Sequence, residues 1–172
     1  MSLARHVSSV TLHPLRLRDV TPSYVRWMND PDVVRYLMAG RSRHTRASVR
    51  AFVRGCRDET FAIRYRGRHV GNVMLRTLDP VSRVGEVGIL LGDRSTWGRG
   101  VASAAVQQLT ALAFGAWKLE KLWAGTCNPA AARLFHRNGW SREGYQRRHV
   151  YLSGQWCDHW LFGLQRSGAG AS

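Results

Sequence analysis

The segment EVGILLGDRSTWGRGVA, residues 86–102, decides the fold of this 172-residue chain. Its first part has the period-two pattern of a strand, and the rest is a glycine-containing loop that opens a long helix. Amides at a helix start have no partner within the helix, and the helix dipole favours negative charge there. Gly98 and Gly100 let the backbone approach a phosphate oxygen, and Arg94 and Arg99 could add charged hydrogen bonds. The segment therefore predicts an anion-binding loop; the alternative is a plain glycine turn.

Two familiar phosphate-binding loops do not fit this segment. A P-loop would continue with Gly-Lys-Ser/Thr, and no such residues follow Gly100. The dinucleotide-binding fingerprint would need a third glycine and a preceding βαβ unit, and the sequence has neither. The segment is therefore neither a P-loop nor a dinucleotide-binding loop.

The residues before this segment predict an edge strand followed by short helices. Residues 10–17 alternate apolar and polar side chains, with a slip at Pro14. Thr21-Pro22 and Asp30-Pro31 each place a capping residue before a proline, which opens a helix. Thr45 caps a third helix, whose apolar stripe is Val49, Phe52, Val53 and Cys56.

The remainder of the chain alternates between strands and helices. Strands are expected at residues 61–65, 70–78, 84–91, 119–127, 142–152 and 156–164. The helix after Gly100 turns one face inward, formed by Ala102, Ala105, Val106, Leu109, Leu112 and Ala113. Asn128-Pro129 caps a second helix that ends at Gly139, with Leu134 and Phe135 inward, and Ser153-Gly154 joins the last two strands. This order predicts an α/β (α+β) fold of three layers, in which helices flank a mixed, mostly antiparallel central sheet.

Composition limits the classes of protein to which the chain can belong. A length of 172 residues, with 44% apolar and 22% charged residues, predicts a single domain, residues 1–172, with a core at about 10–166. No apolar run is long enough to span a bilayer, so no membrane partner is expected. The cysteines, Cys56, Cys127 and Cys157, are widely spaced and odd in number, which favours a reducing cytoplasm over disulfides or zinc.

The net charge of +15 comes almost entirely from arginines. Lys118 and Lys121 are the only lysines among 26 basic residues, a bias that a GC-rich genome would also produce. The resulting field favours anionic ligands and disfavours polycations. The arginines are not concentrated on one helix face and no recognition motif is present, so a nucleic-acid partner is not expected.

Two blocks of sequence together resemble the GNAT acetyltransferases. WGRGVA, residues 97–102, is similar to their pyrophosphate loop, Gln/Arg-x-x-Gly-x-Gly/Ala, with Trp97 at the Gln/Arg position. NPAAARLFHRNGW, residues 128–140, followed by Glu143-Gly144, resembles a second family motif, as do YVRWMNDP at residues 24–31 and Asp158. The blocks follow the family's order, and the branch they resemble contains ribosomal-protein N-terminal and sugar-nucleotide acetyltransferases. The resemblance implies a three-layer GNAT-like fold and acetyl-coenzyme A as co-substrate, with no metal.

The resemblance also implies where the coenzyme lies. The strand ending at residues 89–91 should offer backbone groups to the pantetheine arm and splay away from the strand at 122–127. The loop amides should hold the pyrophosphate, Asn128 should bond the pantetheine or a water, and Phe135 should pack near the thioester. The expected cofactor-binding residues are Ile89, Leu90, Leu91, Arg94, Trp97, Gly98, Arg99, Gly100, Val101, Ala102, Asn128 and Phe135.

Glu86 and Asn128 are the candidate catalytic residues. Glu86 lies on the motif strand where family members often carry a general base; the alternative is a solvated carboxylate paired with a nearby arginine. Asn128 would serve as a helix cap whatever its function. Phe135 occupies the place where many relatives have a proton-donating tyrosine, which leaves water, Tyr145 or Tyr151 as the donor, or an unaided departure of the thiolate. His69, His136, His149 and His159 show no metal spacing and are expected to be surface or structural residues.

The acceptor is expected to be a primary amine on a small molecule or a peptide. The resemblance of residues 24–31 and the positive charge favour an amino sugar attached to a nucleotide; a ribosomal-protein N-terminus is the second option, and a polyamine or aminoglycoside is third. Trp27, Tyr36 and Arg41 are weaker candidates for acceptor contacts. Two other classes stay open, a basic nucleic-acid-binding module and a coenzyme A sensor without catalysis. The edge strands of the last hairpin could pair in a homodimer.

Overall fold

A computed structural model of the chain describes residues 9–56 and 59–166. Within them, one sheet has the strand order β1-β2-β3-β4-β5-β7-β6. The strands are β1 (Val10–Pro14), β2 (Thr60–Tyr65), β3 (Arg68–Asp79), β4 (Val84–Leu91), β5 (Lys121–Thr126), β6 (Ser141–Leu152) and β7 (Gln155–Gln165). The helices are η1 (Leu17–Asp19), α2 (Pro22–Asn29), α3 (Pro31–Val34), η2 (Met38–Arg41), α4 (Arg46–Gly55), η3 (Arg94–Thr96), α5 (Val101–Gly115) and α6 (Pro129–Arg137). Only β4 and β5 pair in parallel, so the expected mixed, mostly antiparallel sheet is confirmed.

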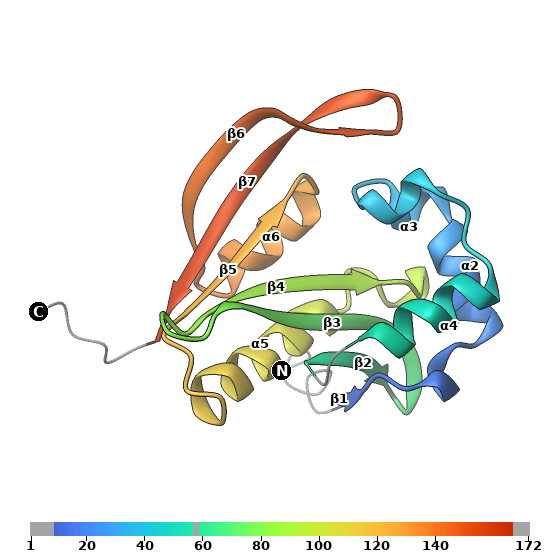
Figure 1. Cartoon of the computed structure of the whole chain (residues 1–172), viewed down its shortest axis with the longest axis horizontal. Coiled ribbons are helices and arrows are strands. Elements are labelled where there is room, and N and C mark those ends of the chain that lie inside the picture. The colour runs from blue at the N-terminus through green and yellow to red at the C-terminus, as the bar shows by residue number, and fades with distance from the viewer. Residues whose placement is uncertain (1–8, 57–58, 167–172) are drawn as a thin grey trace, which may run out of the picture.

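The helices form a layer on each face of the sheet (Figure 1). A large core on one face joins β1–β5 and β7 to α5 and α6, with Leu109, Leu122 and Phe135 almost fully buried. A smaller core on the other face joins α2 and α4 to β2 through Tyr24, Val53 and Ala62. The three-layer GNAT-like architecture expected from the sequence is therefore observed.

Capping residues place several helices where the sequence predicts them. Thr21, Asp30, Thr45 and Asn128 each accept a hydrogen bond from a backbone amide of the helix that follows. Gly139 has φ +82°, the left-handed conformation expected after the end of α6. Local chemistry alone therefore sets these boundaries.

Two expectations from periodicity are wrong. The first strand ends at Pro14 instead of residue 17, because the amide of Leu15 bonds the carbonyl of Thr60 and the chain then turns into η1. In α4, Val49 and Val53 are buried but Phe52 is 49% exposed, so the apolar stripe is narrower than the spacing suggests.

The long hairpin β6–β7 leaves the body of the molecule and arches over toward α3 (Figure 1). Ser153 and Gly154 both have positive φ, as the two-residue turn between these strands requires. β6 is an edge strand of 12 residues and is exposed along most of its length. One hydrogen bond, from the Arg41 guanidinium to the carbonyl oxygen of Tyr151 at 2.9 Å, joins the hairpin to η2.

Candidate active site

The centre of the candidate site is the point where β4 and β5 separate. They pair through Val84–Lys121, Gly85–Leu122 and Glu86–Trp123. Beyond Glu86, β4 continues along β3 to Leu91, whereas β5 continues along β7 to Thr126. The facing edges of residues 87–91 and 124–126 therefore have no strand partner on that side within the described chain. Such edges offer backbone hydrogen-bonding groups to an extended ligand, and the splay expected from the sequence is present.

The loop after β4 has the conformation that an anion site needs. Gly98 and Gly100 adopt φ +72° and +76°, and Gly100 is the N-cap of the 15-residue helix α5. No side chain caps this helix start within the described residues, so its first amides remain available. No atom of the described chain lies within 4 Å of a Cβ built at either glycine, so the loop surface is open. Unpaired amides, a helix dipole and open space together fit the pyrophosphate of coenzyme A.

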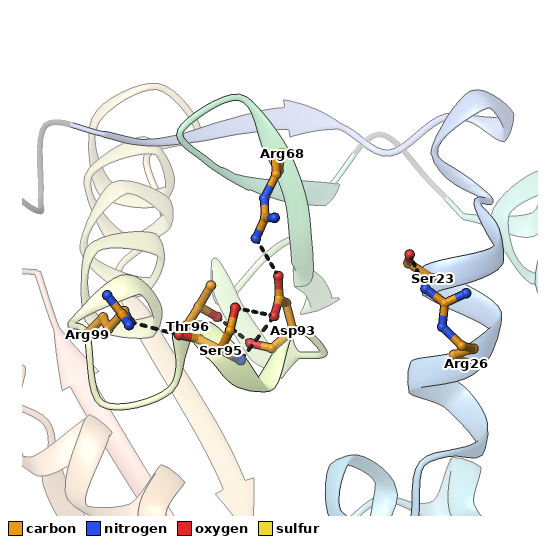
Figure 2. Close-up of polar contacts among 7 residues, drawn as sticks. All are labelled: Ser23, Arg26, Arg68, Asp93, Ser95, Thr96 and Arg99. Atoms are coloured by element: carbon orange, nitrogen blue, oxygen red, sulfur yellow. Dashed lines mark hydrogen bonds and ion pairs between the residues drawn. The ribbon is translucent and has the colours of Figure 1, made fainter.

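The loop is held by its own side chains. The Trp97 indole Nε1 donates to the Leu91 carbonyl oxygen at 2.9 Å, and the Arg99 Nε donates to the Ser95 carbonyl oxygen at 2.8 Å. Asp93 caps η3 through the amide of Ser95 and accepts an ion pair from Arg68 at 2.9 Å, as Figure 2 shows. The loop is therefore largely preformed before any ligand arrives.

Arg94 does not extend toward the open loop surface. Its guanidinium lies 2.7 Å from a carboxylate oxygen of Asp32 and 3.6 Å from one of Asp30. These ion pairs tie the loop to α3. In this structure Arg94 thus links the loop after β4 to the α2–α3 segment.

The two faces of β4 point to different layers. Val87, Ile89 and Leu91 pack into the core beneath α5, so Ile89 and Leu91 can offer a ligand mainly their backbone groups. Leu90 packs with the smaller core, which places Glu86 on the α2–α4 face by the period of a strand. The Glu86 carboxylate is 27% exposed and lies 3.5 Å from the Arg76 guanidinium. Glu86 is therefore both paired with an arginine and located where the strands separate.

Residues 9–141 match the family described as acetyltransferase (GNAT) domain. The chain belongs to the GNAT family. Among solved structures, Mycobacterium smegmatis RimJ in complex with CoA-disulfide is 25% identical, with a TM-score of 0.82 over 95% of this chain and 85% of that one. RimL, a ribosomal L7/L12 alpha-N-protein acetyltransferase solved with coenzyme A, is 17% identical, with a TM-score of 0.81 over 92% and 94% of the two chains. The spermidine N-acetyltransferase from Vibrio cholerae, solved with CoA and spermine, is 18% identical, with a TM-score of 0.82 over 93% and 97%.

This GNAT protein is therefore an acetyl-CoA-dependent N-acetyltransferase, and the two non-enzymatic interpretations are set aside. No protein of curated function matches the chain in sequence. In the described part of the chain, no helix is long and apolar enough to cross a membrane, and no three His, Cys, Asp or Glu residues form a group that could hold a metal ion.

Asn128 and Phe135 both have structural roles in this GNAT fold. The Asn128 Oδ1 accepts from the Ala130 amide at 2.9 Å and so caps α6, and its Nδ2 remains available to donate to a ligand. Phe135, expected to pack on the coenzyme, is 1% exposed and packs against the Phe162 and Trp140 rings, with centroids 5.8 and 4.9 Å away. It has almost no surface left for a ligand, because α6 turns it into the core.

The candidate proton donors lie on the β6–β7 hairpin. The Tyr145 hydroxyl donates to the Asp158 carboxylate, which raises the pKa of Tyr145 and makes its proton harder to release. The same hydrogen bond, with a second from the Arg148 amide, lowers the pKa of Asp158. Tyr151 is 50% exposed and contacts the ring of Trp156. Of the two tyrosines, Tyr151 is the one whose proton is not committed to a carboxylate.

The structure draws attention to His159, which the sequence placed among surface or structural histidines. Its ring lies directly against Gly125, where a Cβ would come within 2.3 Å of the imidazole. The Gln146 side chain is 3.1 Å from its Nδ1, and the His149 ring stacks on it at 5.3 Å. Burial and then His149 lower the pKa of His159, which favours the neutral, proton-accepting imidazole. Only the register of β7 against β5 reveals this position.

The three weaker acceptor candidates do not converge. Trp27 packs between Tyr24, His69 and Gly92, whereas Tyr36 lies after α3 beneath the Arg35 guanidinium. Arg41 reaches the hairpin at Tyr151. Within the described residues, no hydrogen bond or ring contact joins these three side chains to one another.

Proposed function

We propose that this enzyme acetylates the primary amine of an anionic small molecule, of the class of nucleotide-linked amino sugars. The observation that carries the proposal is the charge of the segment that covers the acceptor side. Residues 15–56 contain nine arginines and three aspartates. Each aspartate is already paired, Asp19 with Arg64 and Asp30 and Asp32 with Arg94. A polyamine would meet repulsion on this side, whereas a diphosphate would be attracted.

Different residues around the gap would bind the coenzyme and accept the proton of the amine. The open amides of the loop at 97–102 would hold the pyrophosphate, and the free edge of β4 would hydrogen-bond the pantetheine arm. When bound, acetyl-CoA supplies an activated acetyl group. Glu86 would accept the proton of the incoming amine, and the neutral imidazole of His159 is a second candidate for the same task. The Asn128 Nδ2 would orient the arm or a water molecule.

A protein N-terminus is the second candidate acceptor. It is favoured by the likeness to RimJ and RimL, the latter named for acetylation of ribosomal L7/L12. The half-exposed aromatic rings of Tyr151 and Trp156 on the hairpin would suit a peptide laid along the gap. Arginines near the gap would bind an acidic peptide in preference to a basic one.

A thioester-cleavage assay with three amines tests these assignments. We expect the highest kcat/KM with a UDP-linked amino sugar, a lower value with an acidic N-terminal peptide, and none with spermidine. Preferential turnover of spermidine would overturn the proposal.

The role of Glu86 is tested with Glu86→Gln and a matched control, Arg76→Gln, which removes only the ion-pair partner. Glu86→Gln should lower kcat, alter the pH–rate profile and leave acetyl-CoA affinity within about twofold. Arg76→Gln should keep kcat within a small factor. An unchanged pH–rate profile in Glu86→Gln would exclude Glu86 as the base and leave His159.

A further inference from the structure

A hollow of about 540 Å³ lies outside the gap between β4 and β5. Its walls come from η1 and α2 on one side and from the end of β2, the start of β3 and Asp93 on the other. The side chains that decide its chemistry are Arg18, Arg26, Arg64, Arg68, Trp27 and His69. None of residues 97–102 lines it, so it is separate from the expected pyrophosphate loop. Its volume is that of an ordinary small-molecule site.

The hollow has more positive than negative charge. Asp19 and Asp93 also line it, but Asp19 is paired with Arg64 at 2.6 Å and Asp93 with Arg68 at 2.9 Å. Arg18 has no ion pair within the described residues, and the Arg26 guanidinium contacts only the Ser23 hydroxyl, at 2.7 Å. Two guanidinium groups are therefore left without a carboxylate, on the η1–α2 wall.

Arginines lie on both sides of the hollow. Figure 2 shows Arg26 with Ser23 on α2, and Arg68 with Asp93 on the opposite side. Guanidinium groups offer planar pairs of N–H donors that match phosphate oxygens, and two walls can hold one phosphate from both sides. Arg68 is 69% exposed in its side chain and can turn from Asp93 to a ligand.

Two aromatic side chains, Trp27 and His69, line the hollow. The Trp27 and His69 rings meet edge to face, with centroids 5.2 Å apart. The His69 Nε2 lies 2.9 Å from the Asn72 Oδ1, but its Nδ1 is buried and has no hydrogen-bond partner in the described part of the chain. The two rings offer the organic part of a ligand a surface to lie against.

We propose that this pocket binds the phosphate group of a small phosphate ester of mononucleotide size. The phosphate lies between Arg26 and Arg68, with Arg18 at the rim, and the organic part lies against Trp27 and His69. This site goes beyond the proposed function, because it binds its ligand whether or not the acceptor carries a phosphate.

Calorimetric titration of the full chain with AMP, in the presence of saturating coenzyme A, tests the pocket. We expect one site, weakened at least tenfold in the double variant Arg18→Gln/Arg26→Gln. The matched control, Arg54→Gln/Arg137→Gln, removes the same charge from exposed positions on α4 and α6 and should change affinity less than twofold. Equal weakening in both double variants would overturn the proposal in favour of a general field effect. Absence of AMP binding, or its loss when coenzyme A is added, would overturn it as well.

A kinetic experiment distinguishes whether the phosphate in this pocket belongs to the acceptor or to a separate ligand. If AMP competes with a UDP-linked amino sugar, and the Arg18→Gln/Arg26→Gln variant raises the KM of that acceptor at least tenfold, the pocket holds the acceptor's own phosphate. If AMP binds without competing, the pocket holds a free phosphorylated ligand. AMP binding is measured without turnover, so failure to acetylate any amine would leave the test of the pocket intact.

Discussion

The loop before α5 and the β6–β7 hairpin flank the same gap but are built in opposite ways. The loop is held by short-range contacts such as Trp97 to Leu91 and Arg99 to Ser95, and two left-handed glycines shape it. The outer part of the hairpin stands away from the body, and Tyr145, Tyr151 and Trp156 are each about half exposed. A preformed loop suits a co-substrate that never changes, whereas an exposed hairpin can be altered without disturbing the core. The difference fits our proposal that the loop holds the coenzyme and that the hairpin lies beside the acceptor.

The largest expected effect tests whether Phe135 belongs to the core or to the coenzyme site. Phe135→Ala should lower the free energy of unfolding by about 3–5 kcal/mol, because it leaves a cavity beside Phe162 and Trp140. Denaturant unfolding measures this loss. The milder Phe135→Leu should keep the protein folded with acetyl-CoA affinity within about twofold. A tenfold weaker affinity in Phe135→Leu would place the ring at the thioester after all.

The loop should be the more sensitive of the two regions to a single charge. Gly100→Glu should weaken acetyl-CoA binding at least 100-fold, or about 2.7 kcal/mol, because it combines a left-handed backbone with a carboxylate at the expected phosphate site. Calorimetry with acetyl-CoA measures the loss. Gly115→Glu is the matched control, since Gly115 ends the same helix with open space around it and no positive φ. Unaltered affinity in Gly100→Glu would show that the loop is only a turn.

The same contrast explains what the sequence could predict. Gly98, Gly100 and the Asn128-Pro129 cap act within a few residues of themselves, so the starts of α5 and α6 were predicted correctly. β4 was predicted with its observed bounds, because buried residues alternate along it. The end of the first strand was missed because it depends on a hydrogen bond from the Leu15 amide to the Thr60 carbonyl oxygen. These residues are far apart in the sequence, so no local pattern predicts their contact.

Side-chain roles at the site were harder to predict than the fold. Arg94 is paired with Asp32, and the Tyr145 proton with Asp158, through contacts that only the tertiary structure creates. Phe135 lies in a block that resembles a family motif, although many relatives have a tyrosine at this place, and the motif does not say which way α6 turns the ring. His159 has no sequence signal at all, because its position depends on how β7 lies against Gly125. Local sequence signals therefore predict the conformation of the loop before α5, whereas the positions of side chains on the hairpin depend on the register of strands far apart in the sequence.

A moderate effect is expected from the indole that holds the loop to β4. Trp97→Phe keeps an aromatic ring beside Arg94 but removes the hydrogen bond to the Leu91 carbonyl oxygen. Loss of one such bond is worth about 0.5–1.5 kcal/mol, so acetyl-CoA affinity should fall by roughly two- to tenfold. Trp156→Phe on the hairpin is the control and should leave this affinity unchanged. Equal losses in the two variants would mean that both regions shape the coenzyme site.

The smallest expected effect is a pH dependence of stability that arises on the acceptor side. Because burial and His149 lower the pKa of His159, the unfolded chain binds a proton at higher pH than the folded one. Above the unfolded value of about 6.5 both states are neutral and this residue adds no pH dependence. As the pH falls from there to the folded pKa, the chain takes up a proton when it unfolds, and unfolding becomes easier.

The free energy of unfolding should therefore decline from pH 7 to pH 5, and His159→Gln should reduce the decline. The free energy of unfolding of His159→Gln at pH 8, where the imidazole is neutral in both states, gives the effect of the substitution on packing alone, and this value is subtracted. An identical decline in both proteins would mean that the ring beside Gly125 is as accessible to protons as it is in the unfolded chain, and the argument for His159 as a neutral base would be lost with it.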